Sequence, residues 1–371
     1  MKNETIPAKA VRHSSGDSDQ SMEVDPSNGN AEHPRSGQIG VAYQSSQPCT
    51  VGTILSERYE ILKTLGEGGM GQVFQAYDRN TKKFCAIKVM HAHLAGSDTD
   101  LRRFEREASV SISLKHQRIV DVFDLGFTNQ QKPFFVMELI QGRSLADILY
   151  DQETLIPREF LNIFSQICDG ISFAHANNVV HRDIKPSNIM IVERDGMQQV
   201  KIVDFGIARI CKTTGEICPT TLKSIMSQFD ASSPLAMNDE RLQHLTQPGE
   251  IFGSPLYMSP EQCRGETADC RSEVFALGCM MFEALTGTAP LKGGSAMQTV
   301  VLRLTGVAPS INEAVPGLTF PLELDAIVAR ALERDPEDRY ETVEQLLMAL
   351  RHLAHTLAST QSANTSVNPH C

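Results

Sequence analysis

Apolar and polar residues alternate from Tyr59 to Leu65, and short runs of similar length, rich in apolar residues, follow up to position 138. Side chains of a β-strand point to opposite faces in turn, so this alternation predicts strands. One stretch instead has the composition of a helix, at 101–114. Together they predict a mostly β-sheet segment with one helix, and the expected strands are 59–65, 72–77, 84–90, 119–125 and 134–138.

After Gly142 the apolar positions return at intervals of three and four, which indicates helices. Two short strands are expected on either side of the turn Asp195-Gly196, with Asp204 at the end of the second. The run 274–282 is almost wholly apolar and predicts a buried helix. The helices expected in this half are 157–177, 272–286, 322–334 and 341–357.

Both ends of the chain are expected to be tails. Residues 1–52 are rich in Ser, Asn, Gln, Gly and Pro, and such a composition buries too little apolar surface to offset the entropy of ordering. Residues 358–371 are expected to form a shorter C-terminal tail. The expected folded domain is 59–355, with a boundary near residue 140.

Charge and cysteine usage narrow the function classes. The 371 residues carry a net charge of −11, which disfavours a nucleic-acid partner. The nine cysteines show no CxxC pair, as expected for a protein of the reducing cytoplasm. We find no signal peptide and no apolar run long enough to span a membrane, and the sequence does not indicate an oligomeric state.

A glycine-rich turn lies between the first two expected strands. It matches GxGxxGxV, a pattern that is weak alone because dinucleotide sites share it. A dinucleotide site needs a helix after the glycines, whereas here a strand follows. The turn therefore predicts a hairpin that covers phosphates with its backbone N–H groups. Its expected ATP-binding residues are Leu65, Gly66, Glu67, Gly68, Gly69, Met70, Gly71, Gln72 and Val73.

Lys88 stands in an apolar run on the third expected strand. A buried ammonium needs a partner, and phosphate oxygens and a helix carboxylate would supply one. Glu107 is the favoured carboxylate, because its neighbours Phe104 and Val110 are apolar and suggest an inward face. Glu105 remains the alternative.

Two charged motifs carry the chemistry. In the segment 181–188, Asp183 would accept or orient the proton of an attacking hydroxyl, and Lys185 would neutralise charge on a moving phosphoryl group. Asn188 would hold a metal ion together with Asp204, the first residue of the motif Asp204-Phe205-Gly206. These parts predict phosphoryl transfer from ATP with Mg²⁺.

From about Tyr59 to about Leu353 the chain resembles the eukaryotic-type protein kinase superfamily, and most of all the bacterial serine/threonine kinases. The motifs quoted above occur in the family's order, and Tyr257-Met258-Ser259-Pro260-Glu261-Gln262 adds a bacterial character. The resemblance implies an α+β fold of two lobes. The N-lobe (59–140) would be β-rich with one main helix, and the larger C-lobe (141–355) mostly helical.

The resemblance also implies roles for single residues. Met137 would gate the adenine pocket, with Glu138 to Ile140 as the hinge. Arg339 would pair with Glu261. Lys185 is typical of the Ser/Thr class, and Gly253-Ser254-Pro255 resembles the segment that receives the residue after the acceptor. The residues expected to sandwich adenine are Val73, Ala86 and Met190.

The chain departs from the family pattern at three places. Ser259 replaces an alanine, a small change. Glu273 stands where an aspartate usually braces the catalytic loop, so an extra methylene must be accommodated. The stretch from Gly206 to Ser259 is long, with an insertion at about 211–248.

Arg182 suggests activation by a phosphate on this long stretch. Thr246 is the favoured autophosphorylation site, and Thr220, Thr221 and Ser224 are weaker candidates. The leading hypothesis is a kinase that acts on Ser/Thr hydroxyls of protein substrates. The alternatives are a pseudokinase that binds ATP as a scaffold and a small-molecule kinase of related fold.

Overall fold

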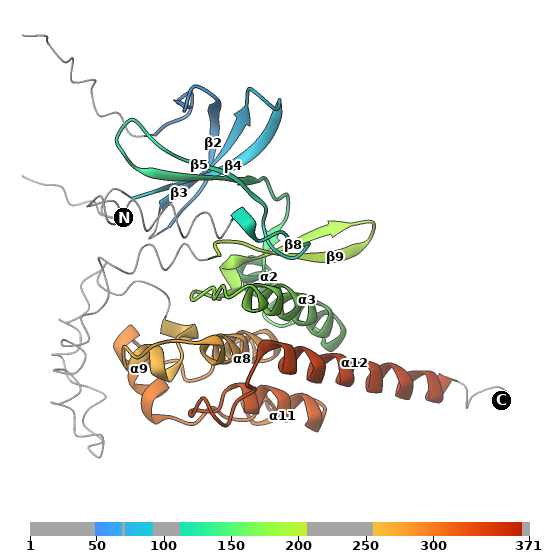
Figure 1. Ribbon diagram of the computed structural model, residues 1–371. Helices are drawn as coiled ribbons and strands as arrows, with labels where there is room; N and C mark the ends of the chain where they lie inside the picture. Colours follow the sequence, from blue (N-terminus) through green and yellow to red (C-terminus); the bar gives the residue numbers. More distant parts are fainter. Residues whose placement is uncertain (1–48, 69–70, 92–111, 206–254, 366–371) are drawn as a thin grey trace, which may run out of the picture. The chain divides into compact units, whose positions relative to one another are not determined.

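The structure is a computed structural model that describes residues 49–68, 71–91, 112–205 and 255–365, with side chains up to residue 359. Strands dominate its N-terminal part and helices its C-terminal part (Figure 1). This is the order of elements that the periodicity predicted.

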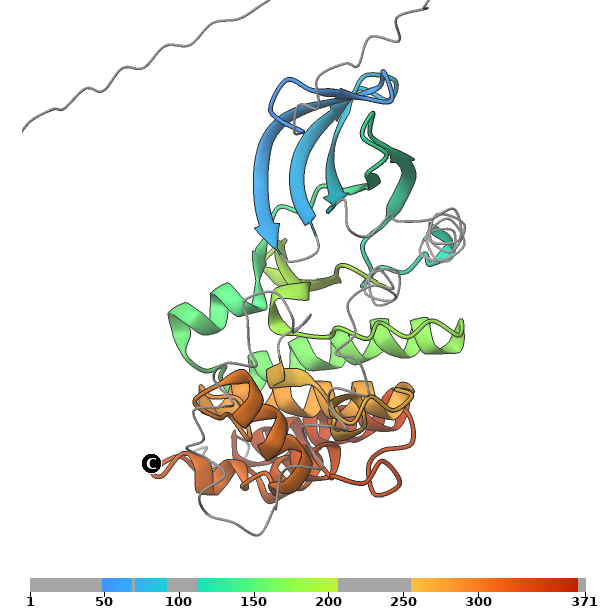
Figure 2. The same cartoon turned by 90° about the vertical axis from the view of Figure 1, so that its left-hand side faces the viewer.

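The N-terminal part is an antiparallel sheet with the strand order β1-β2-β3-β4-β6-β5. Figure 2 shows its strands curving, as expected from the right-handed twist of β-strands. The five predicted strands are confirmed, and a short strand precedes them. The strands are β1 Ile54–Leu55, β2 Tyr59–Gly68, β3 Gly71–Asp78, β4 Lys83–Met90, β5 Val122–Phe127 and β6 Pro133–Glu138.

The sheet starts earlier and β5 starts later than the sequence predicted. The N–H of Gly52 donates to the carbonyl of Ile61, so the chain joins the sheet before position 59. Ile119 lies outside β5 and forms a parallel bridge with Ile202. Of the predicted helix 101–114, only residues 112–114 are described, and 112–113 are helical.

The two faces of this sheet pack into separate apolar clusters, because successive strand residues point in opposite directions. Ile87 and Val89 lie in one cluster with Phe74 and Phe134. Ala86 lies in the other cluster, together with Met137. Lys88 is two residues from Ala86 and therefore belongs to the second face, with Val73 opposite it on β3.

The C-terminal part combines a small sheet of order β7-β8-β9 with helices. The elements are β7 Arg143–Ser144, β8 Ile189–Arg194, β9 Met197–Ile202, α2 Leu145–Gln152, α3 Pro157–Ala176, α7 Pro260–Cys263, α8 Cys270–Thr286, α9 Ala296–Thr305, α10 Ile311–Ala314, α11 Leu322–Ala331 and α12 Val343–Thr365, with 3-10 turns η2 Pro186–Asn188 and η4 Pro255–Tyr257.

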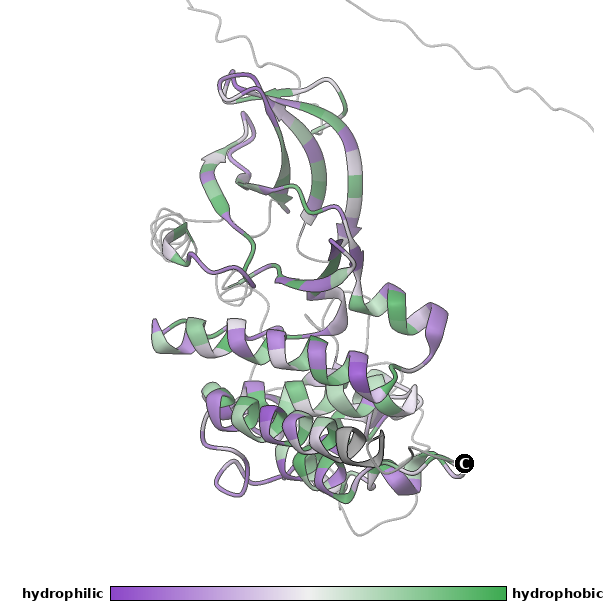
Figure 3. Ribbon diagram, turned by 90° about the vertical axis from the view of Figure 1, so that its right-hand side faces the viewer, coloured by the Kyte–Doolittle hydropathy of each residue, from purple (hydrophilic) through white to green (hydrophobic). Residues whose placement is uncertain are grey.

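Every helix predicted in this half is present. In Figure 3 polar and apolar bands alternate along α3 and α12, as in helices that bury one face. The run 274–282 lies in α8 and is wholly buried. The prediction was wrong about the end of α12, which continues to Thr365 through the expected tail.

The sequence reasoning missed the short helices α2, α7, α9 and α10. A helix of four to ten residues gives a weak periodic signal, although a cap can reveal it. Ser144 caps α2 by accepting from the N–H of Asp147, while the carboxylate of Asp147 bonds back to the N–H of Ser144. This Ser-x-x-Asp pattern was visible in the sequence.

Candidate active site

Lys88 on β4 and Asp204 after β9 form an ion pair that joins the two parts of the chain. The Nζ of Lys88 lies 2.7 Å from Oδ2 of Asp204, and the two side chains are 7% and 25% exposed. Burial alone raises the pKa of Asp204, but Lys88, His181 and Lys185 outweigh it, so the pKa lies below its usual value. Asp204 is therefore a carboxylate at neutral pH and can act as a metal ligand.

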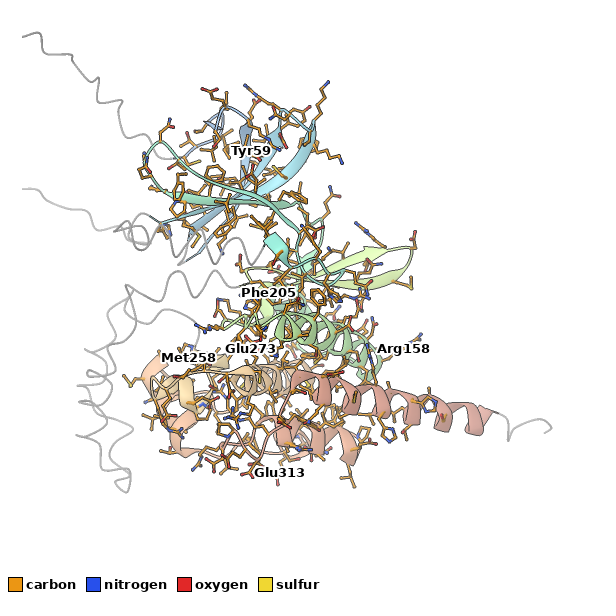
Figure 4. All side chains as sticks on the ribbon, viewed as in Figure 1. Tyr59, Arg158, Phe205, Met258, Glu273 and Glu313 are labelled. Carbon is orange, nitrogen blue, oxygen red and sulfur yellow. The ribbon has the colours of Figure 1, made fainter. Side chains whose placement is uncertain are left out.

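Backbone contacts hold Asp204 beside the segment 181–188. The N–H of Val203 donates to the carbonyl of Asn188 at 2.9 Å, and Nε2 of the fully buried His181 lies 2.9 Å from the carbonyl of Val203. The imidazole of His181 also contacts the ring of Phe205, with centroids 4.7 Å apart. Figure 4 labels Phe205 between the sheet and the helices. These contacts fix Asp204 although its φ of 66° is left-handed.

The three predicted catalytic residues converge. The Nζ of Lys185 donates to Oδ2 of Asp183 at 2.7 Å, and Nδ2 of Asn188 donates to the carbonyl of Asp183 at 2.8 Å. The turn η2 places Asn188 there by reversing the chain after Lys185. The Asp183 side chain keeps 18% of its surface exposed, so a hydroxyl can still reach its carboxylate.

Glu273, the family departure at the base of this loop, makes the bracing contacts despite its extra methylene. Its side chain is 3% exposed on α8. Oε1 accepts the backbone N–H of Arg182 at 2.5 Å, and Oε2 lies 2.6 Å from Nε2 of His175 on α3. Arg182 has a φ of 69°, so this carboxylate stabilises a left-handed residue next to Asp183. His175 gave no signal in the sequence.

For the phosphoryl transfer that the sequence predicts, replacing Glu273 with alanine is expected to lower kcat about ten- to a hundredfold, since a hydrogen bond to a charged group contributes about 1.5–3 kcal/mol. The N–H of Arg182 would lose its acceptor, and the catalytic loop its support. The KM for ATP should change little, because Lys88 and Asp204 are untouched. Steady-state kinetics of the purified variant measure both constants.

The matched substitutions are Glu273→Gln and Glu273→Asp. Glutamine retains an oxygen for the N–H of Arg182 and should keep more activity than alanine. Aspartate is one methylene shorter than the spacing that α8 provides here, so it too should lower kcat. Full activity of Glu273→Asp would show that the length of this side chain does not matter.

The predicted glycine hairpin is present between β2 and β3. Gly66 pairs with Val73, and Gly68 pairs with Gly71 across it. A Cβ on Gly71 would lie 2.2 Å from the carbonyl oxygen of Val89, so the fold requires glycine there. A Cβ on Gly66 or Gly68 would meet no atom of the described residues within 4 Å, which leaves space beside the backbone for a ligand. Leu65 and Glu67 are exposed on β2, and Gln72 is half-buried on β3.

The residues expected around adenine only partly come together. Ala86, Met137 and Ile140 pack in one cluster, and Val73 lies on the same face of the sheet. Met190 lies on β8 and is half-buried. These five side chains are apolar, as a flat heterocycle requires.

The side chain of Glu138 is engaged elsewhere. Its Oε1 accepts from Nζ of Lys201 at 2.5 Å and from the N–H of Asp121 at 3.0 Å. Any hinge contact with adenine would therefore use the backbone after β6. Lys201 was not singled out from the sequence, because nothing local connects it to β6.

Several predicted residues lie outside the described part of the chain, among them Gly69, Met70, Glu107, Gly253, Ser254 and Thr246. The same holds for Glu105, Gly206 and the insertion 211–248, so the carboxylate partner proposed for Lys88 on the helix and the phosphosite stay predictions.

The described residues 255–263, here named the acceptor segment, are anchored to the helices below. Arg339 donates to both oxygens of Glu261 at 2.8 and 2.9 Å, which confirms the expected pair. The hydroxyl of Tyr257 donates to Oε2 of Glu283 at 2.6 Å. Ser259 caps α7 through its side chain, so its replacement of alanine adds a hydrogen bond.

The donors around Asp204 suit a hard divalent cation. Within the described ranges no three His, Cys, Asp or Glu side chains cluster as a self-contained metal site. Mg²⁺ is commonly held by one or two protein oxygens together with substrate phosphates, so such a cluster is not needed. Asp204 offers a carboxylate, and Asn188 an amide oxygen, since its Nδ2 is used by Asp183.

The fold matches solved structures of a protein kinase domain. A crystal structure of the PknI kinase domain from Mycobacterium tuberculosis aligns with a TM-score of 0.60 at 22% identity, covering 83% of this chain and all of that one. The architecture is therefore the two-lobed α+β fold of protein kinases, as the resemblance implied.

Sequence comparison identifies the family. The model of the protein kinase domain matches residues 59–350. Serine/threonine-protein kinase PknB of Mycolicibacterium smegmatis is 36% identical over 297 residues, which are 79% of this chain and 42% of that protein. PrkC of Bacillus subtilis is 36% identical over 296 residues, or 80% and 40%. The chain belongs to the protein kinase family.

The chain spans about two fifths of the length of these curated relatives. In the part of the chain that the structure describes, no helix combines the length and the apolar character that crossing a bilayer demands.

Proposed function

We propose that this protein is an ATP-dependent serine/threonine protein kinase. The observation that carries the proposal is the convergence of Asp183, Lys185, Asn188 and Asp204, with Lys88 bonded to Asp204. The relatives at 34–36% identity are named serine/threonine-protein kinases, and Lys185 is the residue of that class.

The nucleotide would lie between the glycine hairpin and Asp204. Lys88 would bind phosphate oxygens from the sheet side. A bound Mg²⁺ ion would be held by Asp204 and Asn188. Its positive charge would stabilise the negative charge of the phosphate oxygens during transfer. The open space beside Gly66 and Gly68 lets the hairpin backbone approach those phosphates.

The acceptor would be a Ser or Thr hydroxyl next to Asp183. The carboxylate of Asp183 orients this hydroxyl and takes its proton, while the hydroxyl oxygen forms the new bond to the terminal phosphorus and the bond to the leaving ADP oxygen breaks. The ammonium of Lys185, 2.7 Å from Asp183, offsets negative charge on the transferred group. The alternative of an inactive ATP-binding scaffold has no support in these residues, because each charged group needed for transfer is present.

Incubation of the protein with ATP and Mg²⁺ is expected to place phosphate on Ser and Thr residues of the protein itself and of an added Ser/Thr peptide. Removal of Mg²⁺ with EDTA should abolish incorporation, because Asp204 and Asn188 bind phosphates only through the metal. Mass spectrometry of the product measures the sites, and we expect Thr246 among them.

The outcomes separate the parts of this proposal. Incorporation that persists in EDTA would contradict the metal assignment. Phosphorylated peptide with an unmodified segment 211–250 would retain the kinase but remove the proposed autophosphorylation. No incorporation into any acceptor would favour the scaffold.

Location in the cytoplasm also stays a proposal, based on the pattern of the nine cysteines.

A further inference from the structure

Helix α9 is attached to the domain largely through the acceptor segment. It packs against η4 and α7. Met297 and Val300 of α9 form a small apolar cluster with Cys263, separate from the main core, and Met258 and Leu304 flank it. A residue of α9 that bonds both to the acceptor segment and to α8 would add a further anchor for that segment.

Arg303 of α9 is such a residue. It is 1% exposed, among the most buried large side chains of the described chain. Its Nη2 donates to the backbone carbonyl of Leu256, between Pro255 and Tyr257. Its Nη1 donates to Sγ of Cys279 on α8 at 3.1 Å, and the guanidinium lies 5.4 Å from the ring centroid of Phe275.

The surroundings of this buried cation are unusual. No carboxylate of the described residues forms an ion pair with Arg303, and its Nε has no hydrogen-bond partner there. Burial raises the pKa of the Cys279 thiol above its ordinary value, so this acceptor is neutral. A buried guanidinium with neutral acceptors costs stability, since its desolvation is not offset by a negative charge. If position 303 served only to pack the core, an apolar side chain would stabilise the fold more.

We propose that Arg303 is a positioning residue for the peptide acceptor. Its bond to the Leu256 carbonyl holds the acceptor segment against α8 and α9 and so fixes the wall that meets the residue after the phosphorylated Ser or Thr. This inference rests on the proposed kinase function, because it assigns the acceptor side of the same site. Asp183 and Lys185 lie outside the contacts of Arg303, so its effect falls on peptide binding and not on ATP.

The test compares Arg303→Met with the unchanged protein on Ser/Thr peptide mixtures in which the residue after the acceptor is fixed in turn. The variant is expected to raise the KM for peptide about ten- to a hundredfold, the scale of a lost hydrogen bond to a charged group, with the KM for ATP unchanged. Its preference at the fixed position should flatten. Arg303→Lys should restore part of the KM, because an ammonium can still reach one acceptor.

Arg334→Met is the matched control. Arg334 donates to the carbonyls of Thr305 and Gly306 at the end of α9 and has a buried unpaired Nε, like Arg303, but it makes no bond to the acceptor segment. It should leave the peptide KM and the preference unchanged. Equal effects of both substitutions would overturn the proposal, since α9 as a whole would then be responsible.

Hydrogen exchange tests the positioning without turnover. Arg303→Met should speed amide exchange in residues 256–259, and Arg334→Met should not. If the unchanged protein transfers no phosphate, the proposed function fails while this measurement still decides the role of Arg303. Unaltered exchange in Arg303→Met would refute that role even in an active kinase.

Discussion

Asp183→Asn is expected to reduce the rate of phosphoryl transfer by about two to four orders of magnitude, the usual contribution of a positioned general base. The amide can still accept a hydrogen bond but cannot take a proton. It also removes the negative charge that holds Nζ of Lys185 at 2.7 Å. The bond from Asn188 goes to the backbone carbonyl of residue 183, so the loop should keep its shape.

The measurement is transfer of labelled phosphate from ATP to peptide, with nucleotide affinity determined separately. ATP affinity should stay within a few-fold, because Lys88 and Asp204 are unchanged. Asp195→Asn is a suitable control. Asp195 is exposed in the β8–β9 turn with a φ of 52°, which asparagine also adopts readily. Equal incorporation by Asp183→Asn and the unchanged protein would refute the catalytic assignment.

Arg339→Met is expected to lower the free energy of unfolding by about 3–5 kcal/mol, the cost of breaking one side of a buried ion pair. Arg339 and Glu261 have side-chain exposures of 0% and 7%. Beyond its two bonds to Glu261, Arg339 donates to the backbone carbonyls of Arg271, Glu333 and Arg334. Methionine keeps the apolar part of the side chain. The Glu261 carboxylate and these carbonyls would then lose the hydrogen bonds that Arg339 donates.

Urea unfolding measures this loss, and pH gives an independent check. Burial alone raises the pKa of Glu261, but the bonds from Arg339 and Ser272 outweigh it and bring the pKa to about 2. Because the pKa is lower in the folded state, the carboxylate stabilises the fold above about pH 4.5 and this contribution is lost as the pH falls toward 2. Arg339→Met should weaken that acid dependence.

The double variant Glu261→Met with Arg339→Met decides whether the charge is responsible. Two apolar residues leave no buried ion, so the double variant should be more stable than Arg339→Met alone. If the two losses simply add, the ion pair is not the cause and the damage lies in packing.

The sequence determined the parts of this protein whose contacts are local. The strands and long helices follow from alternation and helical spacing, because burial of one face imposes that periodicity. Asp183, Lys185 and Asn188 lie within six positions of one another, so one turn brings them together. The glycine hairpin was readable because the strands on either side exclude a helix after the glycines.

The tertiary structure decided what depends on residues far apart in the chain. Lys88 bonds Asp204, Glu273 reaches Arg182 and His175, and Arg303 holds Leu256. A charged side chain shows in the sequence only that it needs a partner. Which partner it finds depends on how helices and strands pack against each other. In that packing, a difference of one methylene or one helical turn decides whether a hydrogen bond forms.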